Sequence, residues 1–161
     1  MSILFKKKSV LKVKDFLKEN LPETELIVLK NTARSAEDAA NALEQHVGAI
    51  VKSLSFKNSN NNFYLCLVSG DKYLSYKKLS NLIKDNVIKA NAEEVKKQTG
   101  FSIGGVSPFA HLNNPKKTYI DENLKKYDTI YAAAGHPHVV FGIKFKDLVR
   151  LSKGKVEDLV E

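Results

Sequence analysis

The chain has 161 residues, of which 43% are hydrophobic and 27% are charged, and its formal net charge is +8. This length and composition predict one globular domain over residues 1–161, and the sequence holds no uninterrupted apolar run long enough to cross a membrane. The single cysteine, Cys66, excludes an internal disulfide and favours the reducing cytoplasm as the compartment.

Hydrophobic periodicity predicts helices and strands that alternate irregularly along the chain. The predicted helices cover residues 9–20, 35–46 (with Ser35 opening a capping box), 77–88 and 92–98, a turn from 121 to 126, and one or two further helices from 146 to the end. The predicted strands cover residues 26–29, 49–56, 63–68, 118–120, 129–134 and 139–143. Because no regular strand–helix–strand repeat links them, the pattern favours a mixed α/β or α+β domain.

Positive charge is concentrated in two segments. The first twenty residues carry six lysines against Asp15 and Glu19, a surplus of +4. Residues 77–97 carry six more lysines, mixed with Asp85, Glu93 and Glu94. Such clusters suit a polyanion such as nucleic acid, and a solvated lysine-rich surface is the alternative. Because Arg34 and Arg150 are the only arginines, contacts to a phosphate backbone fit the composition better than reading of a DNA sequence.

Lys52 occupies an unusual place in the predicted strand 49–56. Period-two alternation puts it on one face with Ile50, Leu54 and Phe56, which are all apolar. Burying an unpaired ammonium is costly, so such a lysine is paired, extends its head to water or has a function. The alternative is a lysine that protects an edge strand from aggregation.

Residues 100–109 hold three of the chain's eight glycines and one of its four prolines. Glycine allows positive φ and close backbone approach, so a turn of this composition exposes N–H groups that can hold a carbonyl or a phosphate. A tight connection between two elements explains the same composition equally well.

Five segments follow one another in a recognisable order: Ser35-Ala36-Glu37-Asp38-Ala39-Ala40, Ile50-Val51-Lys52-Ser53-Leu54, Thr99-Gly100-Phe101, Gly104-Gly105-Val106-Ser107-Pro108-Phe109 and Ala132-Ala133-Ala134-Gly135. In this order and spacing they resemble the YbaK family of aminoacyl-tRNA editing domains, also called prolyl-tRNA-synthetase-associated domains. The resemblance covers roughly residues 30–155 and is weakest over the basic helical region of residues 1–25.

The resemblance implies a compact α/β domain with a mixed, barrel-like sheet surrounded by helices. It implies hydrolysis of the ester that joins a wrong amino acid to the 3′ end of a tRNA, without a metal or organic cofactor. The implied partner is tRNA, bound by its aminoacylated end and acceptor stem, with an aminoacyl-tRNA synthetase as a second partner and neither DNA nor a membrane. One short domain corresponds to the freestanding form, which acts in trans.

The resemblance also assigns roles to residues. Lys52 matches a pocket lysine that contacts the terminal nucleotide or polarises the ester, and Gly104 and Gly105 match the loop whose amides lie against the aminoacyl group. Preorganised N–H donors of that kind stabilise the oxyanion of ester hydrolysis. The implied substrate-binding residues are Ser107, Pro108, Phe109, Gly135 and His136.

Other readings of the sequence stay open. His136 and His138 stand where many relatives carry a small or hydroxyl residue, so His136 either shapes the pocket and orients water or is a polar turn residue. No histidine, cysteine and carboxylate set forms a recognisable zinc site, and Cys66 fits a core position better than a nucleophile. The rival function is a non-catalytic module that binds tRNA or a nucleotide and docks on a synthetase. The amino acid that is removed stays undetermined.

Overall fold

The computed structural model describes residues 2–30 and 35–161. Its α-helices are α1 (Lys8–Asn20), α2 (Ala36–Leu43), α3 (Tyr76–Ile83), α4 (Ala92–Thr99) and α5 (Phe145–Ser152). Its strands are β1 (Leu26–Val28), β2 (Val51–Asn58), β3 (Phe63–Ser69), β4 (Val87–Lys89), β5 (Lys117–Asp121), β6 (Ile130–His136), β7 (Val139–Ile143) and β8 (Lys155–Glu157). Short 3₁₀ turns cover Ile3–Lys6, Val47–Ala49 and Glu122–Lys126.

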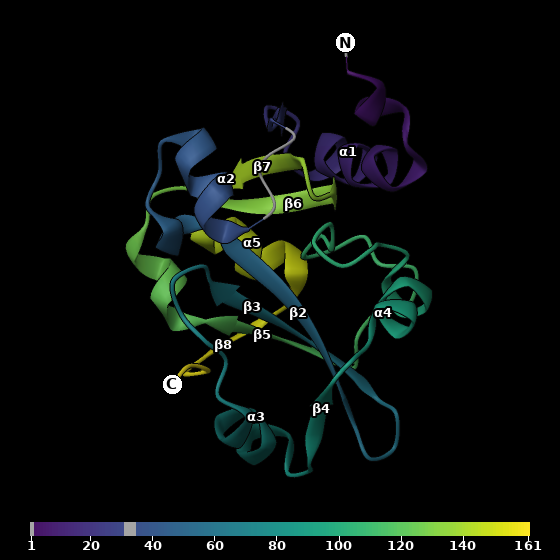
Figure 1. The fold of residues 1–161 in the computed structure, drawn as a ribbon, viewed down its shortest axis with the longest axis vertical. Helices are drawn as coiled ribbons and strands as arrows, with labels where there is room; N and C mark the ends of the chain where they lie inside the picture. The colour runs from purple at the N-terminus through teal and green to yellow at the C-terminus, as the bar shows by residue number, and fades with distance from the viewer. Residues whose placement is uncertain (1, 31–34) are drawn as a thin grey trace.

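The strands form two sheets (Figure 1). The smaller sheet has the order β1-β7-β6 and is antiparallel, whereas the larger one, β4-β2-β3-β5-β8, is antiparallel from β4 to β3 and parallel from β3 to β8. A bridge between Ile50 and Tyr131 links the two sheets. The predicted α/β class with a mixed sheet is therefore confirmed. The barrel-like expectation needs correction, because the described strands form two open sheets rather than one closed sheet.

The main hydrophobic core lies where the two sheets meet the helices α1, α4 and α5. It includes Val10, Val13 and Leu17 of α1, which occupy one face of that helix as the helical period predicts. Their partners include Leu65 and Leu67 of β3 and Phe141 of β7. A second core lies on the other face of the larger sheet, under α3. This packing holds β2 and β6 at a fixed spacing, and the candidate site lies between them.

Three helix ends differ from the prediction by more than one residue. The helix predicted over 77–88 ends at Ile83, because Lys84 adopts a left-handed conformation (φ 58°) and the chain then pairs as β4 with β2. The helix predicted to run to the C-terminus ends at Ser152, since Lys153 is also left-handed (φ 57°) and residues 155–157 add to β5 as β8. Helix α2 ends at Leu43 rather than near residue 46, and Ser35 caps it by accepting a hydrogen bond from the Asp38 N–H (3.1 Å).

The described helices contain none with the length and apolar character that a bilayer crossing requires.

Candidate active site

A cavity of about 290 Å³ lies between β2 of the larger sheet and the β6–β7 hairpin of the smaller one. The glycine-rich loop that follows α4 (residues 100–106) and the start of α2 complete its walls. Its lining residues with polar side chains are Ser35, Lys52, Ser53, Ser55, Lys89 and Tyr131. Much of the remaining wall consists of small or medium apolar side chains, such as Val95, Ala133 and Val140. The cavity is at the lower end of the size range of ligand pockets, about 300–1,000 Å³.

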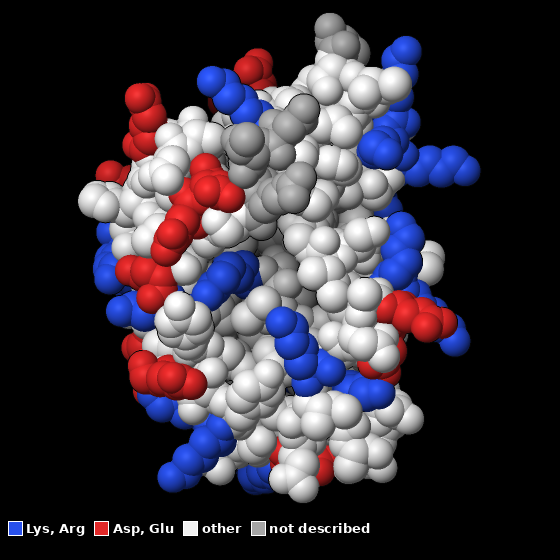
Figure 2. Space-filling model, in the orientation of Figure 1, with Lys and Arg blue, Asp and Glu red and all other residues white. Residues whose placement is uncertain are grey.

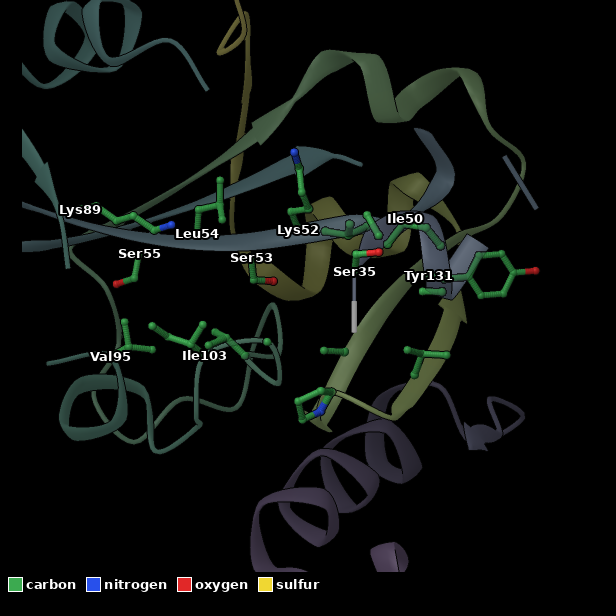
Figure 3. A pocket seen from close by; sticks show the side chains of 18 of the residues that line it. Ser35, Ile50, Lys52, Ser53, Leu54, Ser55, Lys89, Val95, Ile103 and Tyr131 are labelled. Atoms are coloured by element: carbon green, nitrogen blue, oxygen red, sulfur yellow. The ribbon is translucent and has the colours of Figure 1, made fainter. Parts of the chain in front are cut away.

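Lys52 is among the residues that line this cavity from β2, but its ammonium is directed away from the glycine-rich loop. Figure 3 shows Lys52 and Leu54 on one side of β2, and Ser53, Ser55 and Ile103 on the other. The Lys52 Nζ donates a hydrogen bond to the Lys72 carbonyl and lies 5.1 Å from the centre of the Tyr73 ring. Burial lowers the pKa of Lys52, and the negative charges of Asp71 and Asp121 oppose that shift.

The apolar face that the alternation assigned to β2 is confirmed. Phe56 is buried in the second core, and Leu54 packs against that core. Lys52 lies on the same face of β2, and its ammonium contacts the Lys72 carbonyl and the Tyr73 ring. The Lys52 ammonium therefore has a hydrogen-bond partner, which a partly buried charge requires.

The sequence motifs assign no role to Ser53 or Ser55, which lie on the strand face opposite Lys52. Both line the cavity, and Figure 3 shows them projecting from β2 toward Ile103 and Val95. The Ser53 hydroxyl oxygen is buried, and in the described part of the chain it is the one buried side-chain polar atom without a hydrogen-bond partner. The available signal was the alternation itself, which places two serines on the face next to the buried Val51.

The glycine-rich loop forms a turn against the β6–β7 hairpin. The Gly105 N–H donates to the Ser102 carbonyl (2.9 Å), and Gly104 has φ +88°, as at the third position of a type II turn. Gly104 lines the cavity, and its N–H has no acceptor among the described residues. A Cβ on Gly105 would lie 2.9 Å from the His136 Cα. Gly105 therefore provides close packing, and Gly104 presents a free amide.

Gly135 lies at a bulge in β6, where the pairing with β7 shifts register between Ala133 and His136. Its φ is +88°, and a Cβ there would overlap the Ser9 carbonyl oxygen of α1 and lie 2.6 Å from the Ser9 carbonyl carbon. The structure thus places Gly135 in contact with α1, next to the hairpin turn that supports the glycine-rich loop.

Ser107, Pro108 and Phe109 are buried beneath that loop. The Ser107 hydroxyl accepts from the Phe109 N–H (3.3 Å), and the Ser107 carbonyl is hydrogen-bonded to His111 Nε2 (2.6 Å). The Phe109 ring stacks on Phe16 of α1 at 4.4 Å between centroids. In the structure these residues anchor the loop to α1; the lining of the cavity comes from Lys52, Gly104 and their neighbours.

His136 and His138 lie at the hairpin turn. His136 Nδ1 accepts from the His138 N–H (3.0 Å), so the ring caps the turn, and burial, with smaller effects of His138 and Lys7, lowers the pKa of His136. Pro137 between them lines the cavity. Across residues 2–30 and 35–161, no three histidine, cysteine or acidic side chains come close enough to share a metal ion.

Cys66 lies in the second core, where burial raises the pKa of its thiol. This confirms the core position that the sequence favoured, and a nucleophile would require the thiolate that burial disfavours.

Positive charge flanks the cavity. Lys52 and Lys89 both line it, and no aspartate or glutamate is among its described lining residues. Figure 2 shows lysine and arginine side chains on both sides of the hollow in the middle of this face. An anionic ligand that enters the hollow would therefore meet cations at the rim.

Comparisons with known proteins identify the family of this chain. The model of the family described as aminoacyl-tRNA editing domain matches residues 30–151. A solved structure of a candidate trans-editing enzyme for prolyl tRNA synthetase superimposes with a TM-score of 0.90 at 36% identity, over 96% of this chain and 98% of that one.

Two sequence relatives extend the comparison. The uncharacterised protein YwhH of Bacillus subtilis (strain 168) is 29% identical over 134 residues, which are 83% of this chain and 85% of YwhH. A proline–tRNA ligase of Sulfurihydrogenibium sp. (strain YO3AOP1) is 34% identical over 101 residues, 63% of this chain but only 17% of the ligase. The chain belongs to the aminoacyl-tRNA editing domain family.

Proposed function

We propose that this protein is an aminoacyl-tRNA deacylase that hydrolyses the ester of mischarged tRNA in trans. The observation that carries the proposal is the small cavity that combines Lys52 and the free Gly104 amide with largely apolar walls. The family membership and the similarity to a candidate trans-editing enzyme for prolyl tRNA synthetase support it. A misacylated tRNA that the synthetase produces is then the substrate.

The cavity favours a small amino acid. Its volume of about 290 Å³ has to accommodate the aminoacyl group and part of the terminal ribose. Side chains such as Val95, Val106 and Val140 surround that space and would contact a larger substrate. A change of one methylene alters binding in such a pocket by only about 1–3 kcal/mol, so size alone gives moderate selectivity.

The Gly104 N–H is our candidate for the oxyanion donor. Attack of water on the ester carbonyl places negative charge on the carbonyl oxygen, and a fixed amide in a water-poor site stabilises that charge. The amide stays fixed because Gly105 closes the turn and packs on His136. Ser107, Pro108 and Phe109 anchor the same loop, and Gly135 and His136 hold the facing turn, so we assign these residues to positioning.

Lys52 is our candidate for an anchor of the terminal nucleotide. Its ammonium points away from Ile103 and the glycine-rich loop (Figure 3), which favours a contact to a phosphate over polarisation of the ester. Lys89 on the neighbouring strand adds a second cation at the same cavity. Attack on an ester requires only a positioned water, so no side-chain nucleophile is part of the proposal.

Single-turnover deacylation tests this function. Wild-type protein and Lys52→Ala are mixed with tRNA that carries one of a panel of small amino acids, and release of the amino acid is followed. We expect the wild type to release at least one of them and Lys52→Ala to lose that activity while it remains folded. Lys125→Ala, at an exposed position outside the cavity lining, is the control. Full activity of Lys52→Ala would remove Lys52 from the mechanism.

The second candidate is the binding module that keeps the fold and the cavity without turnover. The pairing of Lys52 with the Lys72 carbonyl favours it, because a paired lysine has a structural role as it stands. In that case the wild type binds mischarged tRNA but does not accelerate loss of the amino acid.

A further inference from the structure

The Ser53 hydroxyl is the starting point of an inference that rests on the proposed function. Its oxygen is buried and has no hydrogen-bond partner among the described residues. Ser53 lines the cavity, and Figure 3 shows its side chain on the cavity side of β2. Buried hydroxyls in folded proteins almost always have a partner, so an unpaired one that lines a ligand cavity is a position at which a bound ligand can supply it.

The chemistry of the cavity limits what that partner is. Lys52 and Lys89 line it, and its described lining residues include no carboxylate. A buried ammonium has no counterion there, which argues against the α-amino group of the amino acid as the group that Ser53 meets. A neutral hydroxyl fits better, because each of two hydroxyls can either donate or accept, whereas a thiol is a weak partner in both roles.

We propose that Ser53 is a specificity-determining residue that hydrogen-bonds the side-chain hydroxyl of the bound amino acid, so that the preferred substrate is a small hydroxyl amino acid such as serine. The surrounding wall of Val95, Ala133 and Val140 then limits the size of that side chain. A site built to pair with a hydroxyl rejects an analogue that lacks it far more strongly than an apolar pocket rejects a missing methylene.

The decisive comparison uses two substrates of nearly equal shape. Serine and 2-aminobutyrate differ by a hydroxyl in place of a methyl group, so the ratio of their deacylation rates isolates the hydrogen bond from size. We expect wild-type protein to hydrolyse seryl-tRNA at least about tenfold faster than 2-aminobutyryl-tRNA. Ser53→Ala should bring this ratio to about one, mainly by slowing the seryl substrate.

Ser55→Ala is the matched control. Ser55 is on the same strand face, lines the same cavity and is 7% exposed, but its hydroxyl oxygen is not among the fully buried side-chain atoms that lack a partner. Ser55→Ala should therefore keep the wild-type ratio. Ser53→Ala should also keep or raise the melting temperature, because alanine removes an unpaired buried hydroxyl without leaving a large cavity.

Binding of non-hydrolysable analogues separates this proposal from the proposed function. Adenosine-terminated RNA that carries a 3′-amide of serine or of 2-aminobutyrate is titrated against the wild type and both variants. A preference for the seryl amide that disappears only in Ser53→Ala supports the proposal even if no variant hydrolyses an ester. Equal weakening of both analogues by Ser53→Ala, an unchanged ratio, no wild-type preference, or a lowered melting temperature of that variant would each overturn it.

Discussion

Gly135→Ala tests the packing of the β6–β7 hairpin on α1. Gly135 has φ +88°, where an alanine is strained by about 1–2 kcal/mol. The added Cβ would also overlap the Ser9 carbonyl oxygen and lie 2.6 Å from the Ser9 carbonyl carbon, both of which are backbone atoms that cannot rotate away. Forced overpacking of this kind costs about 1–3 kcal/mol more. We therefore expect a total loss of about 2–5 kcal/mol in the free energy of unfolding.

Gly100→Ala provides the matched control. Gly100 ends α4 with φ +83°, but its nearest contact to an added Cβ is the Leu112 Cβ at 3.4 Å, an ordinary van der Waals distance. Only the conformational strain of about 1–2 kcal/mol should appear there. Urea unfolding of both variants measures the two losses, and their difference is the cost of the overlap with α1.

The same pair of variants separates a structural from a substrate-binding role of Gly135. We expect the deacylation rate of Gly135→Ala to fall only in proportion to its folded fraction. If Gly135→Ala is no less stable than Gly100→Ala, the inferred packing on α1 is wrong. If its activity is lost while its stability is kept, Gly135 contacts the substrate and the positioning role that we assign to it is refuted.

Three further predictions follow from single residues. If Lys52 contacts a phosphate, Lys52→Ala should reduce the slope of log affinity for tRNA against log salt by about 1, whereas an unchanged slope would favour a role at the ester. Burial lowers the pKa of His111, so as the pH falls through about 6.5 the unfolded state takes up a proton before the folded state does. The free energy of unfolding should therefore drop until the folded-state pKa is reached. His111→Gln should flatten this drop in urea titrations at pH 5–7, and an equally steep drop in that variant would contradict the prediction. Asn91 and Glu94 form a reciprocal capping box at α4 (2.8 and 3.0 Å), so Asn91→Ala should cost about 0.5–2 kcal/mol in the free energy of unfolding, and no measurable loss would show that the cap does not contribute.

Local patterns predicted what depends on local physics. Helical spacing predicted that Val10, Val13 and Leu17 share one face of α1, and alternation predicted that Leu54 and Phe56 share one face of β2. The structure confirms that each set packs against a hydrophobic core. The two missed strands, β4 and β8, have three residues each, and their strand conformation comes from pairing with β2 and β5 rather than from their own sequence.

The site was only partly accessible to sequence reasoning. Alternation placed Lys52 on one face of its strand, but the direction of its ammonium depends on Lys72 and Tyr73, which lie twenty and twenty-one residues further along the chain. The significance of Ser53 arises only when the β6–β7 hairpin and the glycine-rich loop close over β2. Such contacts join segments that are remote in the chain, and no local period encodes them.

Multiple turnover tests the central claim most directly. Mischarged tRNA is supplied in large excess over folded wild-type protein, and the free amino acid is counted per protein molecule. A deacylase releases many equivalents at a rate well above that without protein. Release that never exceeds the protein-free rate over the whole panel of small amino acids, together with measurable tRNA binding, would show a binding module and contradict the proposed catalysis.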